Sequence, residues 1–178
     1  MQKTMHRLIF FILMMLITVW LAACTTTLKP VYVLRHAEKG LGSDPDLTPA
    51  GQARAQELLR MLRNVTVNAI YSTDTKRTRQ TAQPLATAKN LTIQIYSDLS
   101  IANTILSGSE EQVVVIVGHS HTVPELITAF GGTPPYTDIP GNEFDNLFFL
   151  IVKKTKKFGG GTDITTKVLH MKYGSVSD

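Results

Sequence analysis

The feature that most constrains the fold is a strong strand signal past the middle of the chain, five consecutive β-forming residues from Val113 to Val117. Shorter strand signals lie before and after it, and segments with apolar residues at helical spacing separate them. Strands that alternate with helices are typical of an α/β fold whose sheet is mostly parallel. The 178 residues show no internal repeat and no dividing linker, so we expect one domain of this class.

Strands are predicted over residues 31–34, 69–71, 92–96, 113–117, 147–152 and 164–171, and helices over 49–63, 76–88 and 122–130. Thr48 is placed to cap the first helix, Pro84 is expected to kink the second, and Thr122 with Glu125 matches a capping box at the start of the third. Residues 153–162 are expected to form a polar, glycine-rich loop. Its lysines favour a solvated hairpin, with contact to anionic lipid headgroups as the alternative.

The N-terminal segment has the anatomy of a bacterial signal peptide. Lys3 and Arg7 precede an uncharged run from Leu8 to Ala23, which is shorter than the about 20 apolar residues of a membrane-spanning helix. The run leads into Cys24, and this end resembles the site where lipoprotein signal peptidase cleaves and the cysteine becomes the lipidated N-terminus. An uncleaved anchor is the alternative.

We therefore predict a signal peptide over residues 1–23, a lipidated N-terminus and tether over 24–29, and a folded domain over 30–178. The acyl chains on Cys24 would hold the protein on a bilayer, facing the periplasm. Thr25 in place of an aspartate after the cysteine favours the outer membrane.

Charge and cysteine content exclude several kinds of site. Two of the four net positive charges come from Lys3 and Arg7, so the rest of the chain gives little support for nucleic-acid binding, and no nucleic-acid partner is expected. The chain has one cysteine, which excludes an intramolecular disulfide framework and a cysteine-based zinc site.

Three segments with unusual chemistry follow predicted strands, at the edge of a parallel sheet where ligands bind. They are Arg35 to Glu38, Ser72 to Arg79, and Gly118 to His121. Cations gathered at one edge repel one another unless an anion is bound. Arginine's planar fork suits phosphate, and a neutral imidazole can attack phosphorus. The three segments therefore predict a site for a phosphorylated ligand.

These segments resemble the signature of the histidine phosphatase (phosphoglycerate mutase-like) superfamily. Val33 to Lys39 (VLRHAEK) is similar to its Arg-His motif, with Ala37 in place of the commoner glycine; Tyr71 to Ala86 is similar to its second arginine block, and Val117 to Ser120 to its second-histidine block. The order and separation also match. The resemblance implies a small branch-1-type phosphatase, a three-layer α/β/α sandwich with a mostly parallel central sheet and no large cap insertion.

The resemblance also implies a covalent phosphohistidine intermediate. By motif position, His36 would be the nucleophile, and Arg35, Arg77 and His119 would hold the phosphoryl oxygens. Residues two apart on a helix point to different faces, so only one of Arg77 and Arg79 is expected in the pocket, and the motif alignment selects Arg77. No metal or other cofactor is implied.

Three further residues are predicted to contact the substrate: Glu38, Ser120 and His121. His121 stands where relatives often have asparagine, and it is expected to contact substrate, donate a proton or lie at the rim. The substrate would be a phosphorylated small molecule or a phosphoprotein.

One feature of the family is missing. Many members carry a glutamate between the third strand and the second histidine that protonates the leaving alkoxide. In this chain that interval, residues 97–112, is very short. Its only carboxylates are Asp98, Glu110 and Glu111, and no familiar motif surrounds them. Small phosphohistidine phosphatases of the superfamily can lack this acid because their leaving group is an imidazole. We therefore predict hydrolysis of a phosphomonoester or phosphohistidine, and no mutase activity.

Two other functions stay open. A lipoprotein with a phosphate pocket and no general acid would bind a phosphorylated envelope component without turnover. Ser120 after a strong strand also resembles the nucleophile elbow of serine hydrolases, with Asp145 and His170 to complete a triad, although Thr122 stands where that turn needs glycine. A zinc pair of His119 and His121 would lack a carboxylate cluster to complete it.

Overall fold

A computed structural model describes residues 25–108, 112–157 and 160–177, together with residues 3, 5–7, 10 and 11. Cys24 and most of the predicted signal peptide lie outside these residues, so their roles stay predictions. No helix in the described part of the chain is long and apolar enough to cross a membrane.

The domain is built on one six-stranded sheet with the order β3-β2-β4-β1-β5-β6. Its strands are β1 (Thr25–Arg35), β2 (Ala69–Ser72), β3 (Ile93–Ile95), β4 (Val114–Gly118), β5 (Asn146–Lys156) and β6 (Thr162–Lys172). The first four pair in parallel, whereas β5 and β6 are antiparallel to their neighbours. The predicted mostly parallel sheet is confirmed.

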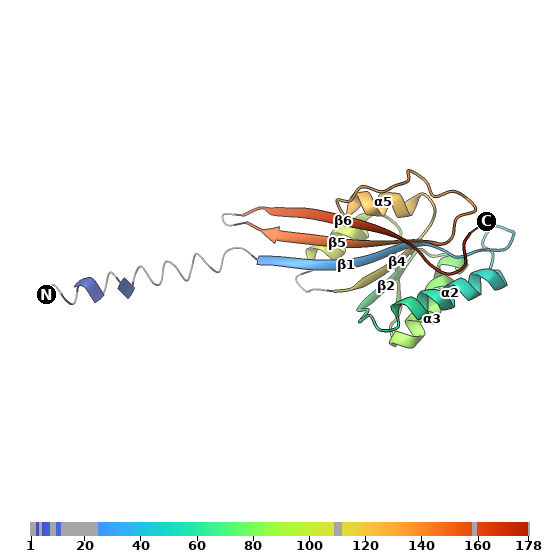
Figure 1. Cartoon of the computed structure of the whole chain (residues 1–178), viewed down its shortest axis with the longest axis horizontal. Coiled ribbons are helices and arrows are strands. Elements are labelled where there is room, and N and C mark those ends of the chain that lie inside the picture. Colours follow the sequence, from blue (N-terminus) through green and yellow to red (C-terminus); the bar gives the residue numbers. More distant parts are fainter. Residues whose placement is uncertain are drawn as a thin grey trace.

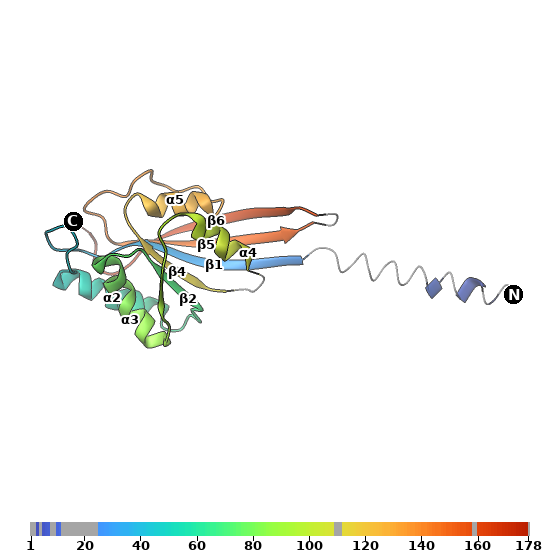
Figure 2. The same ribbon diagram turned by 180° about the vertical axis from the view of Figure 1, so that it is seen from behind.

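Four helices cover the two faces of the sheet: α2 (Pro49–Leu62), α3 (Lys76–Lys89), α4 (Ser100–Ser107) and α5 (Thr122–Ala129). Figures 1 and 2 show α2 and α3 on one face and α4 and α5 on the other. Each face has its own apolar core: one packs Leu58, Leu85 and Ile70 together, and the other packs Leu126, Phe130 and Phe148. The chain thus forms the three layers that the family resemblance implied.

Most predicted elements lie within a residue or two of their expected bounds. Thr48 caps α2 as expected, its hydroxyl accepting from the Gly51 amide at 3.1 Å. Gly51 allows α2 to approach the preceding loop, because a Cβ there would lie 2.1 Å from the Glu38 carbonyl oxygen. Helix α3 continues through Pro84 without a break.

Four local features differ from the sequence predictions. Residues 25–29, expected to be a tether, form the first half of β1 and pair with β5 from Thr25↔Lys156 to Lys29↔Val152. The loop predicted over 153–162 is shorter, because β5 continues to Lys156. Helix α4 was not predicted. The capping box at α5 is not formed: the Thr122 hydroxyl accepts from the His119 amide at 2.7 Å, and that helix has no side-chain cap bond.

Candidate active site

The sheet order places the three predicted segments side by side. Strand β4 lies between β2 and β1, so the carboxyl ends of these three strands are neighbours. At the ends of the ladders Arg35 is the partner of Gly118, and Ser72 of Val117. The His36 amide continues the β1–β4 ladder by donating to the Gly118 carbonyl at 2.9 Å. Parallel strand pairing therefore brings residues from positions 35, 72 and 118 onward to one edge.

A pocket of about 340 Å³ opens at this edge. Its lining side chains are Arg35, His36, Lys39, Arg77, His119, Ser120 and His121. Six of these seven residues are among the predicted site residues. Lys39 was quoted in the motif but not assigned to the site, and Glu38 is predicted but absent from the lining. No carboxylate is found among the described lining residues, so the pocket is suited to an anion.

His36 is held in one tautomer. Its side chain is almost fully buried, with 3% of the residue exposed. Nδ1 lies 2.8 Å from the Ala37 carbonyl oxygen, which can only accept, so Nδ1 carries the proton of the neutral ring. The lone pair is then on Nε2. His36 has the bonding pattern that a nucleophilic imidazole requires.

The pocket histidines are kept neutral by their surroundings. Burial lowers the pKa of His36 to about 3, and the charges of Arg35, His119 and Arg77 act in the same direction against the opposing hydrogen bond to Ala37. Burial also lowers the pKa of His119 to about 4, with contributions from Arg77, His121 and Arg35. The two rings meet edge to face with centroids 5.5 Å apart. A bound anion would offset the positive charges that keep both rings unprotonated.

His119 is oriented by Thr73, which is held in turn by hydrogen bonds with Thr78 and Thr75. Its Nε2 lies 3.0 Å from the Thr73 hydroxyl oxygen. The Thr73 hydroxyl donates to Thr78 Oγ1 at 3.2 Å, while the Thr78 hydroxyl donates to the Thr73 and Thr75 carbonyls. Because the Thr73 proton is used in this way, its oxygen is left to accept from His119 Nε2–H. Sequence reasoning missed Thr73, which stood inside the quoted second block.

Arg35 is fixed by the loop before β5. Its Nη1 donates to the Pro140 and Glu143 carbonyls at 2.8 and 3.0 Å, and its guanidinium carbon lies 4.3 Å from the centre of the Phe144 ring. The buried Nε of Arg35 has no hydrogen-bond partner within the described residues, and the same holds for Nε of Arg77. Buried donors of this kind are expected to find a partner when the site is filled.

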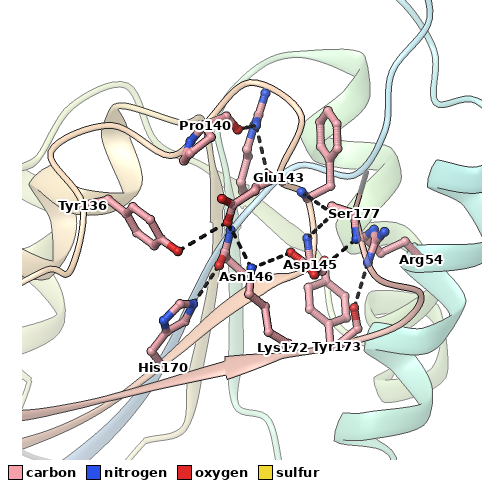
Figure 3. Close-up of polar contacts among 12 residues, drawn as sticks. Arg54, Tyr136, Pro140, Glu143, Asp145, Asn146, His170, Lys172, Tyr173 and Ser177 are labelled. Atoms are coloured by element: carbon pink, nitrogen blue, oxygen red, sulfur yellow. Dashed lines mark hydrogen bonds and ion pairs between the residues drawn. The ribbon is translucent and has the colours of Figure 1, made fainter.

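Residues after β6 stabilise the same loop. The Ser177 hydroxyl accepts from the Phe144 and Asp145 amides at 2.8 and 3.1 Å, and the Ser177 amide donates to the Asp145 carboxylate at 3.3 Å (Figure 3). The loop that supplies carbonyl groups to Arg35 is therefore also held by Ser177.

Arg77 and Arg79 take different environments, as the helical spacing predicts. The Arg77 side chain lines the pocket with 16% of its surface exposed, and its Nη1 lies 3.5 Å from Asp44 Oδ1. The Arg79 side chain is 41% exposed and pairs with Asp74 outside the pocket. The structure thus brings together His36, Arg35, Arg77 and His119, the four residues predicted to be catalytic.

Glu38 points to a different part of the fold. Its carboxylate accepts from Arg54 Nη2 at 2.6 Å and from Nε at 3.0 Å, and the Arg54 side chain is only 3% exposed. Arg54 also donates to the Tyr173 carbonyl at 2.7 Å (Figure 3). The structure therefore places Glu38 in a link between the loop after β1, α2 and the segment after β6, and outside the pocket lining where substrate contact was predicted.

The residues needed by the serine-hydrolase alternative have other partners. Asp145 pairs with Lys172 at 2.9 Å, and His170 Nε2 lies 2.7 Å from Asn146 Oδ1 (Figure 3). The His170 ring also stacks on Phe148. His119 and His121 stack with centroids 6.0 Å apart. Within the described ranges no group of three or more His, Cys, Asp or Glu side chains is placed to hold a metal ion.

A second, larger hollow of about 630 Å³ lies between α2 and α3. Glutamine, leucine, alanine, proline and threonine side chains line it. None of these described lining residues is titratable.

Comparison with known proteins shows the fold, and part of the chain matches a family model. Residues 31–101 match the model of the histidine phosphatase superfamily (branch 1), a segment that includes the first two motifs and ends before the His119 motif. A search of curated proteins found none that matches this chain significantly.

Solved structures share the fold. SixA from Agrobacterium tumefaciens is 23% identical with a TM-score of 0.54, the alignment covering 79% of this chain and 97% of that one. The protein histidine phosphatase SixA complexed with tungstate is 18% identical with a TM-score of 0.54, over 80% and 96% of the two chains. A mycobacterial glucosyl-3-phosphoglycerate phosphatase is 14% identical with a TM-score of 0.55, over 79% and 97%.

Proposed function

We propose that the chain is a phosphatase of the histidine phosphatase superfamily, acting through a covalent phosphohistidine on His36. The observation that carries the proposal is the pairing of a neutral, tautomer-fixed His36 with a pocket of cations. Arg35, Arg77 and Lys39 supply positive charge, and no described lining residue is a carboxylate. Two proteins of this fold have been solved with an oxyanion: SixA with tungstate, and a mycobacterial glucosyl-3-phosphoglycerate phosphatase with inorganic phosphate.

The first step is attack of His36 Nε2 on phosphorus. The Nε2–P bond forms as the bond from phosphorus to the leaving group breaks, and the leaving group departs with that electron pair. The ring becomes positively charged, which the Ala37 carbonyl stabilises through the Nδ1–H hydrogen bond. Arg35 and Arg77 offset the charge of the equatorial oxygens, where electrostatic stabilisation supplies most of the rate enhancement.

In the second step water attacks the phosphohistidine. The oxygen–phosphorus bond forms, the Nε2–P bond breaks, and the ring returns to its neutral tautomer as phosphate is released. The water loses its proton to solvent or to the phosphate product. Because the described lining offers no carboxylic acid to protonate an alkoxide, we expect substrates whose leaving group departs without strong acid assistance, and a phosphohistidine fits this best.

Phosphate release from three substrates tests the activity: a phosphohistidine peptide, an aryl phosphate and an alkyl phosphate. We expect rates to fall in that order, and rapid acid–base quench to detect a phosphoprotein that is stable in alkali and labile in acid. His36→Ala should abolish both signals, whereas Ser120→Ala should keep the phosphoprotein. Turnover that survives His36→Ala would overturn the mechanism. Phosphate binding without turnover of any substrate would instead favour the binding lipoprotein.

We further propose that the protein acts in the cell envelope, anchored through an acylated Cys24. The sequence supports this by the apolar run that ends in Leu21-Ala22-Ala23-Cys24. Intact mass of the purified chain tests it: we expect a chain that begins at Cys24 and carries acyl groups. A Cys24→Ser variant should keep the unprocessed mass, and an unmodified Cys24 in the wild-type chain would contradict the anchor.

A further inference from the structure

A second basic region lies at the end of the sheet opposite the pocket. Four of the five residues from 153 to 157 are lysines, and Lys153, Lys156 and Lys157 are exposed. Figure 1 shows the start of β1 and the end of the β5–β6 hairpin extending together, away from α2. In the described part of this hairpin end, Lys157 is offset by an ion pair with Asp163 at 2.6 Å. Among the described residues of this hairpin, the remaining lysines carry positive charge that the proposed reaction does not use.

A small hollow lies between β1 and β5 at this end. It measures about 210 Å³ and is lined by Thr25, Thr27, Gly108, Lys154 and Lys156. Thr25 is directly opposite Lys156 in the ladder, and Thr27 is directly opposite Lys154, so the side chains of both pairs lie on the same face of the sheet.

The chemistry of the hollow suits a phosphate diester. Ammonium groups and hydroxyl groups are both donors to phosphate oxygens. The Lys154 side chain is half-buried, and its Nζ donates to the Leu106 carbonyl at 2.6 Å, which fixes its position. Lys156 is exposed beside it. The hollow therefore presents two positive charges and two hydroxyls on a fixed strand pair.

The position of the hollow identifies its ligand. Thr25, which lines it, is the residue that directly follows Cys24. Because Thr25 is already paired with Lys156, no free residue separates an acylated cysteine from the folded sheet. Resting on the proposed lipid anchor, we propose that Thr25, Thr27, Lys154 and Lys156 form a binding site for the headgroup of an anionic phospholipid in the membrane that holds the acyl chains.

This contact would set the position of the catalytic pocket. Strand β1 runs from Thr25 to Arg35 without interruption, and 11 residues at about 3.3 Å each span about 35 Å. An anchored chain would hold His36 at about this distance from the headgroups, facing away from the lipid. The substrate would then be a soluble molecule or the exposed part of a protein, and not a lipid of the same leaflet.

Amine accessibility in vesicles tests the proposal on the full chain. The purified protein is reconstituted into phosphatidylcholine vesicles with or without phosphatidylglycerol, and acetylation of each lysine is followed by mass spectrometry. We expect Lys154 and Lys156 to react about five-fold more slowly when phosphatidylglycerol is present, and to recover at high salt. Lys167, an exposed lysine further along β6, serves as the internal reference.

When one of the two lysines is replaced by glutamine, the acetylation of the other still reports on lipid binding. In Lys156→Gln the protection of Lys154 should fall about five-fold, and in Lys154→Gln that of Lys156 should fall similarly. The matched variant Lys167→Gln should leave both protected. Equal acetylation in the two vesicle types overturns the proposal, as does protection by inorganic phosphate in detergent without any effect of phosphatidylglycerol. Intact mass reports the anchor and phosphate release reports the enzyme in the same samples, so failure of either is seen separately from loss of protection.

Discussion

The carboxylate of Glu38 lies 2.6 Å from Nη2 of Arg54, an arginine buried in the middle of α2. The residue two positions after the proposed nucleophile is thus tied to the scaffold. Through the same arginine it reaches the Tyr173 carbonyl. We infer that Glu38 positions the loop that carries His36.

Removing Arg54 should therefore cost stability. Arg54→Ala leaves the Glu38 carboxylate, which is 22% exposed, without its partner, and we expect the free energy of unfolding to fall by about 3 kcal/mol. Urea denaturation measures it. Arg60→Ala is the matched control on the same helix, because its pair with Glu57 is exposed and should contribute less than about 1 kcal/mol. A Glu38→Gln variant with normal stability and a raised KM would place Glu38 at the substrate after all.

The two arginines at the start of α3 should differ in activity. Arg77→Ala removes a guanidinium from the pocket and should lower kcat/KM by about 10² to 10³-fold. Arg79→Ala removes an exposed pair with Asp74 and should leave kcat/KM within about two-fold of wild type. Steady-state kinetics on an aryl phosphate decide the matter. Equal losses in both variants would show that the helix as a whole, and not one guanidinium, supports the site.

Thr73 should act through His119. Thr73→Val keeps the shape but removes the oxygen that accepts from His119 Nε2, so we expect kcat to fall about ten-fold, less than the 10² to 10³-fold expected from losing a direct donor. Thr73→Ser should restore most of the rate. The pH dependence of kcat should shift in Thr73→Val but not in Thr73→Ser, because only the valine leaves His119 free to change tautomer. An unchanged pH profile with a lowered melting temperature would indicate a purely structural role.

The pocket histidines should make stability fall in mild acid. The unfolded chain binds protons at His36 and His119 from the ordinary pKa of 6.5 downward, whereas the folded chain takes them up only near 3 and 4. The free energy of unfolding should therefore decrease as the pH falls below about 6.5, by up to about 1.4 kcal/mol per unit for each histidine, and these two groups should have no effect above that pH.

Urea unfolding between pH 7.5 and 4.5 measures this slope. His36→Asn should reduce it, because one of the two groups is removed. Bound phosphate should also reduce it, since a nearby anion raises the pKa of both rings. A slope that is the same in wild type and His36→Asn would mean that His36 is not held neutral by the fold.

The sequence predicted the pocket well because its position follows from strand order and not from side-chain detail. Val113 to Val117 gave the strongest strand signal, and in a parallel sheet the residues after such a strand share an edge with those after its neighbours. Helix periodicity indicated that Arg77 and Arg79 point to different faces, and motif position selected Arg77 for the pocket. These inferences need only periodicity and motif position.

The contacts that turn the pocket into a site could not be predicted in this way. Nothing in the sequence marks Arg54 as the buried partner of Glu38, because an arginine in a helix is usually solvated. The Thr73 network depends on which hydroxyl protons are already used. Lys39 follows the motif directly, and only the fold of the next loop shows that it lines the pocket.

Two of the differences in secondary structure have separate causes. Helix α4 did carry a signal, since its buried residues Ile101, Ala102, Ile105 and Leu106 have helical spacing, but eight residues are too few for it to stand out. Residues 25–29 are strand because β5 is long enough to pair with them, which is a tertiary cause that local propensity does not contain.

The bonds of Ser177 to the loop that holds Arg35 have a practical consequence. Although the two residues lie far apart in sequence, Ser177 and Arg35 both bond one short stretch of backbone, from Pro140 to Asp145. Substitutions or purification tags placed after Tyr173 would then alter how firmly that guanidinium is held. Proteins prepared with different C-terminal extensions are expected to differ in their apparent affinity for oxyanions, even though every pocket side chain is unchanged.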